Sequence, residues 1–281
     1  MRKNIASFFV CAMAVLFMTS CEQDITTPAA EADVRLDSTS ALGQRLVDKE
    51  GHALYFFAND ANGESACTGN CALNWQKFYI DSTTATYGAG LAAADFKTIN
   101  PSSAGYQTTY KGWPLYRYIP AGIQEGINET RGEGVGSVWF VAKPNYSIMI
   151  ANFQLTDAAG VNYLGNYTAG TGRTSYFTDA KGNTLYTFVR DSAFINKSNG
   201  NVNFPIYETG SITVPSTLDK SLFVVINYNG RQQLTYKGWP LYYYAPDNFV
   251  RGSNKGFHFP ATQPAGAIWP VAVRDIALAP R

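Results

Sequence analysis

Short runs of aromatic and β-branched residues, bounded by Gly, Pro or Asn, recur along the chain. Examples are Leu-Tyr-Phe-Phe at 54–57, Leu-Tyr-Arg-Tyr at 115–118 and Val-Trp-Phe-Val at 138–141. Runs of this length and composition are typical of strands. Asn229-Gly230 lies between the apolar segments 222–226 and 233–236 and predicts a hairpin. The pattern therefore predicts an all-β protein, with one short helical turn at 91–96.

The same order of segments occurs twice. The sequence Thr-Tyr-Lys-Gly-Trp-Pro-Leu-Tyr at 109–116 recurs unchanged at 235–242. Upstream, 48–55 matches 179–186, and downstream, 136–139 matches 266–269. Because order and spacing agree, we interpret the chain as an internal duplication.

The duplication predicts two tandem, pseudo-symmetric β repeats of five or six short strands each, packed as one body. The first copy covers 34–144, the second covers 160–281, and 145–159 connects them. A single pseudo-symmetric barrel or a propeller-like closure is an open alternative.

Composition narrows the class of protein further. Charged residues make up 15% of the chain, against roughly 25% in an average soluble domain, which excludes a disordered polyampholyte. Aromatic residues make up 14%, beside 25 Gly and 13 Pro, which favours strands and turns over an all-α bundle. The net charge of +1 provides no field for a polyphosphate backbone, so no nucleic-acid partner is expected.

The N-terminus has the pattern of a signal peptide. Two basic residues precede an apolar run at 5–18, which is too short to span a bilayer comfortably. Small residues before Cys21 resemble the bacterial lipoprotein signal, which implies cleavage after 1–20 and lipid on Cys21. A plain secretory signal is the alternative. Segment 21–33 is small, polar and acidic, as in a flexible tether. We expect a lipid-anchored protein of the cell envelope, in either leaflet of the outer membrane.

Two cysteines remain for the folded body. Cys67 and Cys71 lie close together outside the cytoplasm, which favours a disulfide. A redox centre would need a cation or a helix N-terminus to depress a thiol pKa, and neither is evident in the flanking residues. A metal site would need a third ligand. The only histidines, His52 and His258, are interpreted as ordinary surface or loop residues.

A second pattern joins a tyrosine, an aromatic residue two positions on, and an aspartate five positions on. It occurs at Tyr55/Asp60, Tyr186/Asp191 and Tyr242/Asp247, whereas Tyr116 is followed by Ala121. With the Cys67/Cys71 pair and the repeated boxes, this resembles the bacterial secreted-repeat lipoproteins named for a Tyr-x4-Asp motif, whose biochemical role is undefined. The second copy departs from that family, because Asn-Gly-Asn-Val at 199–202 replaces the cysteine pair. The resemblance implies a fold unit and a location in the cell envelope but no biochemical activity.

The motif residues have a structural interpretation. Tyr55 and Phe57 share one face of a strand, so we expect them and their second-copy counterparts to pack inward. Asp60 and Asp191 follow the strand ends, where a carboxylate accepts backbone N–H groups in an Asx-type turn. The alternative treats Asp60, Asn62 and Glu64 as ligands for a hard cation such as Ca²⁺.

The Gly-Trp-Pro-Leu-Tyr box predicts a strand start or a sheet edge, because Pro cannot donate to a ladder. Its Trp either covers a core or joins an exposed aromatic platform for a glycan or protein ligand. The platform would consist of Trp113, Tyr116, Trp239, Tyr242 and Tyr243. Since three consecutive tyrosines cannot all face inward, Tyr243 should face away from its neighbours, and Arg117 matches it in the first copy.

Motifs of common enzyme classes are missing from the sequence. It has no Gly-x-Ser-x-Gly elbow, His-Glu-x-x-His pair or phosphate-binding loop. A glycosidase needs only two carboxylates, which leaves Glu125, Glu129 and Glu133 as candidates in a loop interpreted as a solvated connection. The prediction is a non-catalytic binding or interaction module without cofactor or metal. The alternatives are a redox or metal-handling accessory using Cys67/Cys71, and a glycan hydrolase.

Overall fold

The computed structural model describes residues 31–39, 41–100 and 105–281. It confirms the all-β prediction, because its regular elements are short strands and short 3₁₀ turns. The turn expected at 91–96 is present as η3 (Ala93–Asp95). The signal peptide and Cys21 lie outside the described residues. None of the described helices is long and apolar enough to cross a bilayer.

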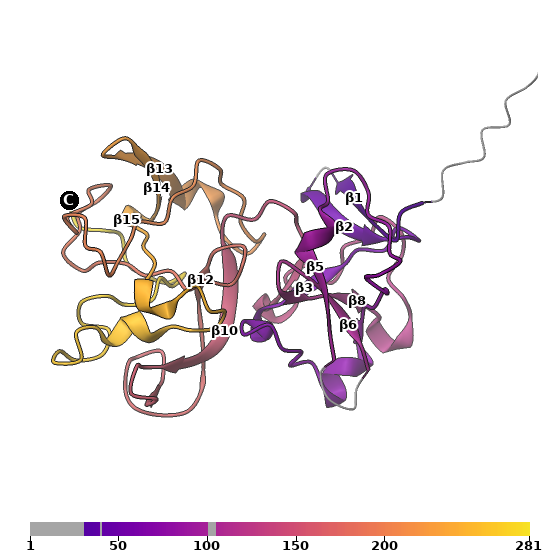
Figure 1. Cartoon of the computed structure of the whole chain (residues 1–281), viewed down its shortest axis with the longest axis horizontal. Helices are drawn as coiled ribbons and strands as arrows, with labels where there is room; N and C mark the ends of the chain where they lie inside the picture. The colour runs from indigo at the N-terminus through magenta and orange to yellow at the C-terminus, as the bar shows by residue number, and fades with distance from the viewer. Residues whose placement is uncertain (1–30, 40, 101–104) are drawn as a thin grey trace, which may run out of the picture. The chain divides into compact units, whose positions relative to one another are not determined.

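The described part of the first copy contains three antiparallel sheets. The strands are β1 (Val34–Thr39), β2 (Gly43–Asp48), β3 (Tyr55–Phe57), β4 (Trp75–Lys77), β5 (Phe96–Ile99), β6 (Gln107–Tyr110), β7 (Trp113–Pro114), β8 (Tyr116–Tyr118) and β9 (Trp139–Val141). Strands β1 and β2 form a hairpin (Figure 1). The central sheet has the order β4-β8-β3-β9, and the third has the order β5-β6-β7. These nine strands exceed the five or six expected, since β1–β2 and the two-residue β7 add to the count.

The rest of the chain repeats this plan with fewer regular strands. They are β10 (Met149–Thr156), β11 (Asn162–Tyr163), β12 (Arg173–Thr178), β13 (Phe223–Tyr228), β14 (Arg231–Tyr236) and β15 (Trp239–Pro240). Strand β10 lies in the segment expected to be a connection. It pairs with β12 as β1 pairs with β2 (Figure 1), so it completes the sheet of the second copy.

In the second copy, isolated β-bridges replace the continuous strands of the central sheet. Tyr186 pairs with Tyr242 and Val271, and Tyr242 also pairs with Ile206. In the first copy Tyr55 pairs with Tyr116 and Val141, and Tyr116 pairs with Lys77. The strand order is therefore the same in both copies. Across the described residues the strands are distributed over five small sheets rather than one closed sheet.

Short 3₁₀ turns connect the strands. They are η1 (Ala58–Asp60), η2 (Gly69–Leu73), η3, η5 (Pro120–Gly122), η6 (Val135–Ser137), η7 (Lys220–Leu222), η8 (Ala245–Asp247) and η9 (Lys255–His258). The predicted hairpin is present as β13 and β14. Its central residues, Asn229 and Gly230, have φ of 53° and 82°, as a primed turn requires.

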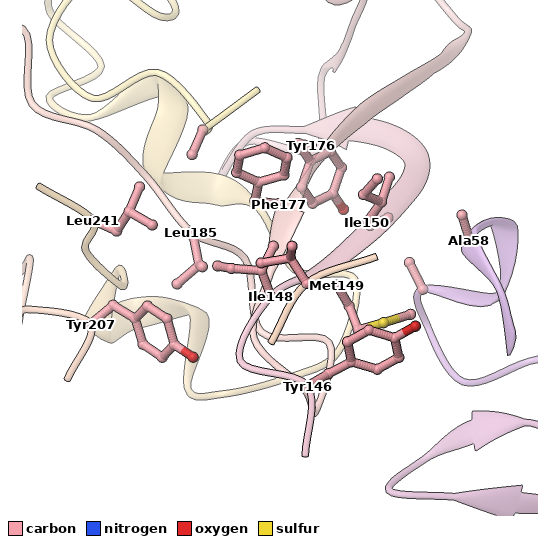
Figure 2. Close-up of a cluster of buried hydrophobic side chains, with 14 of the residues drawn as sticks. Ala58, Tyr146, Ile148, Met149, Ile150, Tyr176, Phe177, Leu185, Tyr207 and Leu241 are labelled. Atoms are coloured by element: carbon pink, nitrogen blue, oxygen red, sulfur yellow. The ribbon is translucent and has the colours of Figure 1, made fainter. Parts of the chain in front are cut away.

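The hydrophobic core is continuous between the two copies. One cluster of buried side chains includes Ala58 of η1, Ile150 of β10 and Phe177 of β12 (Figure 2). Polar contacts accompany it: Asn152 Nδ2 donates to Asn59 Oδ1 at 2.7 Å. Burial of apolar area shared between copies favours one folded body over two independent ones.

Candidate functional site

The two Tyr-x4-Asp motifs of the second copy exchange their hydrogen-bond partners. The Tyr186 hydroxyl donates to Asp247 Oδ2 at 2.5 Å, and the Tyr242 hydroxyl donates to Asp191 Oδ2 at 2.8 Å. Because Tyr186 and Tyr242 are bridge partners on adjacent segments, each hydroxyl reaches the carboxylate that follows the other tyrosine. The motif therefore ties two segments together.

The first copy makes the same arrangement with one substitution. The Tyr116 hydroxyl donates to Asp60 Oδ2 at 2.7 Å. Ala121 stands where the second copy has Asp247, and Glu125 supplies the missing carboxylate: the Tyr55 hydroxyl donates to its Oε2 at 2.6 Å. Glu125 is only 1% exposed, so its interpretation as part of a solvated connection was wrong.

The other two candidate glutamates, Glu129 and Glu133, have different partners from Glu125. Exposed Glu129 forms an ion pair with Arg131 at 3.0 Å. Glu133 accepts the backbone N–H of Val141 at 2.5 Å. The structure thus gives each of these carboxylates a protein donor.

Asp60 and Asp191 also organise the turns that follow them. Asp60 Oδ1 accepts the N–H of Ala66 at 2.8 Å, and Asp191 Oδ1 accepts that of Lys197 at 2.7 Å, each six residues later. The expected backbone bonds are present, although they span more residues than an Asx turn.

The alternative Ca²⁺ site is not assembled in the described residues. Both oxygens of Asp60 accept hydrogen bonds from the protein. Asn62 Nδ2 donates to Glu64 Oε2 at 3.0 Å, and the Asn62 oxygen accepts the Glu64 N–H. The three groups therefore satisfy protein donors instead of converging on one point.

Burial changes the acidity of these groups. It raises the pKa of Asp60 to about 7, although Tyr116 and Ala66 donate hydrogen bonds to the carboxylate. Burial also raises the pKa of Asp191 to about 6 and raises that of Asp247. The pKa of Tyr186 and that of Tyr242 lie above the usual range for the same reason, so both phenols are hydrogen-bond donors at neutral pH.

A stack of three aromatic rings lies beside the Tyr–Asp pairs in the first copy. Trp139 stacks on Phe57 and Trp75 with centroid distances of 4.0 and 3.6 Å. The ring of Tyr116 meets Trp139 edge-on at 5.0 Å. The inward packing predicted for Tyr55 and Phe57 is confirmed, because both are buried.

The second copy repeats the stack around Trp269. Its ring stacks on Phe188 at 4.1 Å and on Phe204 at 3.7 Å, and Tyr242 meets it edge-on at 5.3 Å. Phe204 thus replaces Trp75. Gly256 lies against two neighbouring tyrosines, since a Cβ there would be 2.8 Å from Tyr244 and 2.9 Å from Tyr186.

The Gly-Trp-Pro-Leu-Tyr boxes mainly serve the core. Trp113, Tyr116 and Tyr242 are each 0% exposed, so the expectation that they form an exposed platform is corrected. Trp113 donates its indole N–H to the carbonyl of Ala180 in the second copy at 3.0 Å. Half-buried Trp239 donates to Ala277 at 2.8 Å.

Tyr243 lies between two buried tyrosines and is itself half-buried, in agreement with the predicted alternation. Its hydroxyl donates to Asp179 Oδ2 at 2.9 Å. The matching Arg117 donates through Nε to Asp48 Oδ2 at 2.6 Å. The two copies therefore use different donors, a tyrosine and an arginine, for the aspartate at the equivalent position.

Both histidines are half-buried and bonded to a carboxylate. His258 Nδ1 lies 2.7 Å from Asp157 Oδ2. The ligand atoms of Asp48, Glu50 and His52 lie within 4.8 Å of one another. Arg117 pairs with both of those carboxylates, at 2.6 and 3.5 Å, and its guanidinium already supplies their counter-charge.

Cys67 and Cys71 form the predicted disulfide. Cys67 is 1% exposed and belongs to the smaller hydrophobic cluster, beside Tyr55 and Trp75. A bond in that position tethers the loop after η1 to the core.

Replacing both cysteines by serine is expected to lower the free energy of unfolding by about 2 kcal/mol, because the bond closes a short loop. Urea unfolding of wild type and variant measures the difference. Elemental analysis and a thiol count on the same samples, purified without chelators, provide the control. A bound metal that disappears in the double variant would contradict a purely structural disulfide.

A cavity of about 660 Å³ lies between the Lys111–Gly112 turn of the first copy and the Asp179–Gly182 turn of the second. Tyr207, Tyr243 and Phe249 form its aromatic side. Phe249 is 61% exposed, and its ring meets Tyr243 edge-on at 5.2 Å. Lys97, Lys111, Lys181 and Arg251 supply the cations around it.

Arg251 holds the two turns together. Its guanidinium lies 4.4 Å above the ring of Trp113, and its Nη1 donates to the carbonyls of Lys111, at 3.1 Å, and Lys181. Burial lowers the pKa of Arg251 to about 10, so the side chain stays charged at neutral pH. Stacking on Trp113 is a cation–π interaction.

Sequence reasoning missed Phe249 and Arg251, which belong to no repeated motif. One local feature could have drawn attention to Phe249: it is a large apolar residue two positions after Asp247, in a segment whose pattern does not predict a strand. Only the fold brings this segment beside Lys111 and Trp113 of the other copy.

Comparison with known proteins identifies part of the chain. Residues 38–78 match the model of a family described as a secreted repeat of unknown function. No curated protein and no solved structure matches the chain. The matched segment contains the Tyr55/Asp60 motif and the disulfide, which carried the resemblance seen in the sequence. Residues 38–78 are therefore similar to a secreted repeat of unknown function.

Proposed function

We propose that this chain is a non-catalytic binding module of the cell envelope, anchored through lipid on Cys21, and that its ligand occupies the cavity beside Phe249. The exposed ring of Phe249 at the edge of this cavity is the observation that carries the proposal. The lipoprotein-like residues before Cys21 and the acidic tether at 21–33 support the anchor.

The backbone around Phe249 supports a functional role. Asn248 and Phe249 have φ of 51° and 53°. A bulky residue in the left-handed region costs about 1–3 kcal/mol, and such strain clusters at functional sites. Here the strained conformation holds a large apolar ring in solvent next to Tyr243. Aromatic side chains with a few polar groups are typical of ligand sites.

The arrangement of carboxylates supports binding rather than catalysis. Asp179, at the cavity, accepts hydrogen bonds from Tyr243 and from the side chain of Asn183. Asp60, Asp191 and Glu125 are buried and bonded to tyrosines. A general acid or base must reach its substrate. The last three carboxylates do not line the cavity, so their hydrogen bonds to tyrosine stabilise the fold.

The test is a Phe249→Ala variant on glycan and peptide arrays, probed with the purified chain. A ligand of wild type should bind the variant at least about tenfold more weakly, since buried aromatic contacts dominate recognition. Ile123→Ala is the matched control, because Ile123 is 70% exposed and occupies the equivalent sequence position of the first copy, seven residues after Tyr116 as Phe249 is seven residues after Tyr242.

Two results would contradict the proposal. If Phe249→Ala and Ile123→Ala both retain every ligand of wild type, the ligand does not occupy this cavity. If chromatography shows that wild type cleaves a bound glycan, the module is catalytic.

A further inference from the structure

We infer that the cavity binds an acidic saccharide, a chain of sugar rings that carries carboxylate or sulfate groups; this inference rests on the proposed function. The ligand would place a sugar face against Phe249 and Tyr243 and its acidic groups near Lys97 and Lys181.

The charge around the cavity is the first argument. Lys97, Lys111, Lys181 and Arg251 face it, against Asp95 and Asp179. The whole chain has a net charge of only +1, so positive charge is concentrated here. Wherever the structure describes the chain, none of the three lysines forms an ion pair with a carboxylate.

The hydrogen bonds show which of these charges are available. Lys111 Nζ donates to the carbonyl of Pro144 at 2.5 Å, and Arg251 is bonded to the two turns. Asp179 accepts bonds from Tyr243 and Asn183. Lys97 and Lys181 are exposed, so they are the cations that an anion in the cavity can reach.

The duplication supplies an internal comparison. In the first copy Glu50 stands where the second has Lys181, and Arg117 stands where the second has Tyr243. Arg117 pairs there with Asp48 and Glu50, so the charges neutralise each other. The second copy has instead the ring of Tyr243, and Lys181 forms no ion pair with any described carboxylate. The first copy therefore neutralises its charges within the protein, whereas the second copy leaves Lys181 available to an external anion.

The aromatic side of the cavity favours a sugar among anions. A pyranose ring has C–H groups on its faces, which pack on aromatic rings, and hydroxyl groups on its edge, which bond to polar side chains. Phe249 offers an exposed ring for the first contact. Asn183 is 7% exposed and lines the cavity, and its Oδ1 has no hydrogen-bond partner among the described residues, so it is an unused acceptor at the cavity wall.

The experiment is isothermal titration of the full chain with four probes: a galacturonate hexamer, a sulfated hexasaccharide, neutral maltohexaose and hexaglutamate. We expect at least one acidic sugar to bind more tightly than maltohexaose and hexaglutamate, and the two acidic sugars distinguish carboxylate from sulfate. Raising the salt from about 0.1 to about 1 M shortens the Debye length from about 10 to about 3 Å and should weaken this binding.

A Lys97→Met/Lys181→Met variant should bind the acidic sugar about tenfold more weakly. Lys49→Met is the matched control, because Lys49 is exposed on the equivalent turn of the first copy. Circular dichroism of each variant checks that the fold is intact.

The outcomes separate this inference from the proposed function. If maltohexaose binds as tightly as the acidic sugars and the lysine variant is unchanged, the acidic preference is wrong, while loss of binding in Phe249→Ala still supports the site. Preferred binding of hexaglutamate would make the ligand a peptide and overturn the inference. Absence of binding by every sugar would also overturn it. Acidic-sugar binding that Phe249→Ala retains would contradict both proposals.

Discussion

Replacing Trp269 by alanine is expected to lower the free energy of unfolding by about 3–5 kcal/mol, the range for deleting a large buried aromatic ring. Trp269 is 2% exposed and stacks between Phe188 and Phe204. Its removal takes the middle ring from the stack and opens a cavity beside Tyr242. The Tyr242 hydroxyl donates a hydrogen bond to Asp191. Urea unfolding followed by circular dichroism measures the loss.

Trp239→Ala is the control within the same copy. Its ring is half-buried and its N–H bonds to the carbonyl of Ala277, so its replacement should cost about 1–2 kcal/mol. Trp139→Ala in the first copy should match Trp269→Ala. Equal losses for Trp269→Ala and Trp239→Ala would show that the stack does not dominate the stability of the second copy.

The protein is expected to lose a few kcal/mol of stability between about pH 4.5 and about pH 7.5, because its buried aspartates are protonated in the folded state. An unfolded Asp has a pKa of about 3.9. In the folded chain, burial raises the pKa of Asp60 to about 7 and that of Asp191 to about 6. Between these values the folded state retains protons that the unfolded state has released, so stability falls as the pH rises. Urea unfolding at several pH values measures this slope.

The variant Asp60→Asn/Asp191→Asn is the control for this pH dependence. Asparagine does not titrate; its oxygen can accept the backbone N–H, and its amide N–H₂ can donate to the tyrosine oxygen, which reverses the Tyr–Asp bond. The slope should become shallower in the variant, and Asp60→Asn alone should flatten its upper part. Stability that rises with pH through this window would mean that the tyrosine hydrogen bonds hold both carboxylates ionised.

Local pattern accounts for much of the fold. The spacing of Tyr55 and Phe57 predicted that both pack inward on one face of a strand, and both are buried; Phe56 on the opposite face is buried too. Asn229 and Gly230 predicted their hairpin, because both tolerate a positive φ. The close cysteines predicted the disulfide because they belong to a segment expected outside the cytoplasm, where paired thiols oxidise.

The hydrogen-bond partners of the repeated Tyr-x4-Asp residues could not be predicted in this way. The spacing of Tyr242 and Asp247 suggests a local pair, yet Tyr242 bonds Asp191 and Asp247 bonds Tyr186. Strand pairing decides these contacts, and strand pairing depends on the packing of the whole sheet. Glu125 could replace the missing aspartate at Ala121 because a longer side chain on a different part of the loop reaches the same hydroxyl.

The duplication is visible directly as repeated residues, and several strands, the turn at 229–230 and the disulfide were predicted from local patterns, because they depend mainly on residues close together in the chain. The three-dimensional fold was needed to show which tyrosine bonds which carboxylate, that β10 completes the second copy, and that Arg251 stacks on Trp113 beside a cavity. These features join residues far apart in the chain, and their contacts exist only once the burial of apolar surface has brought the two copies together.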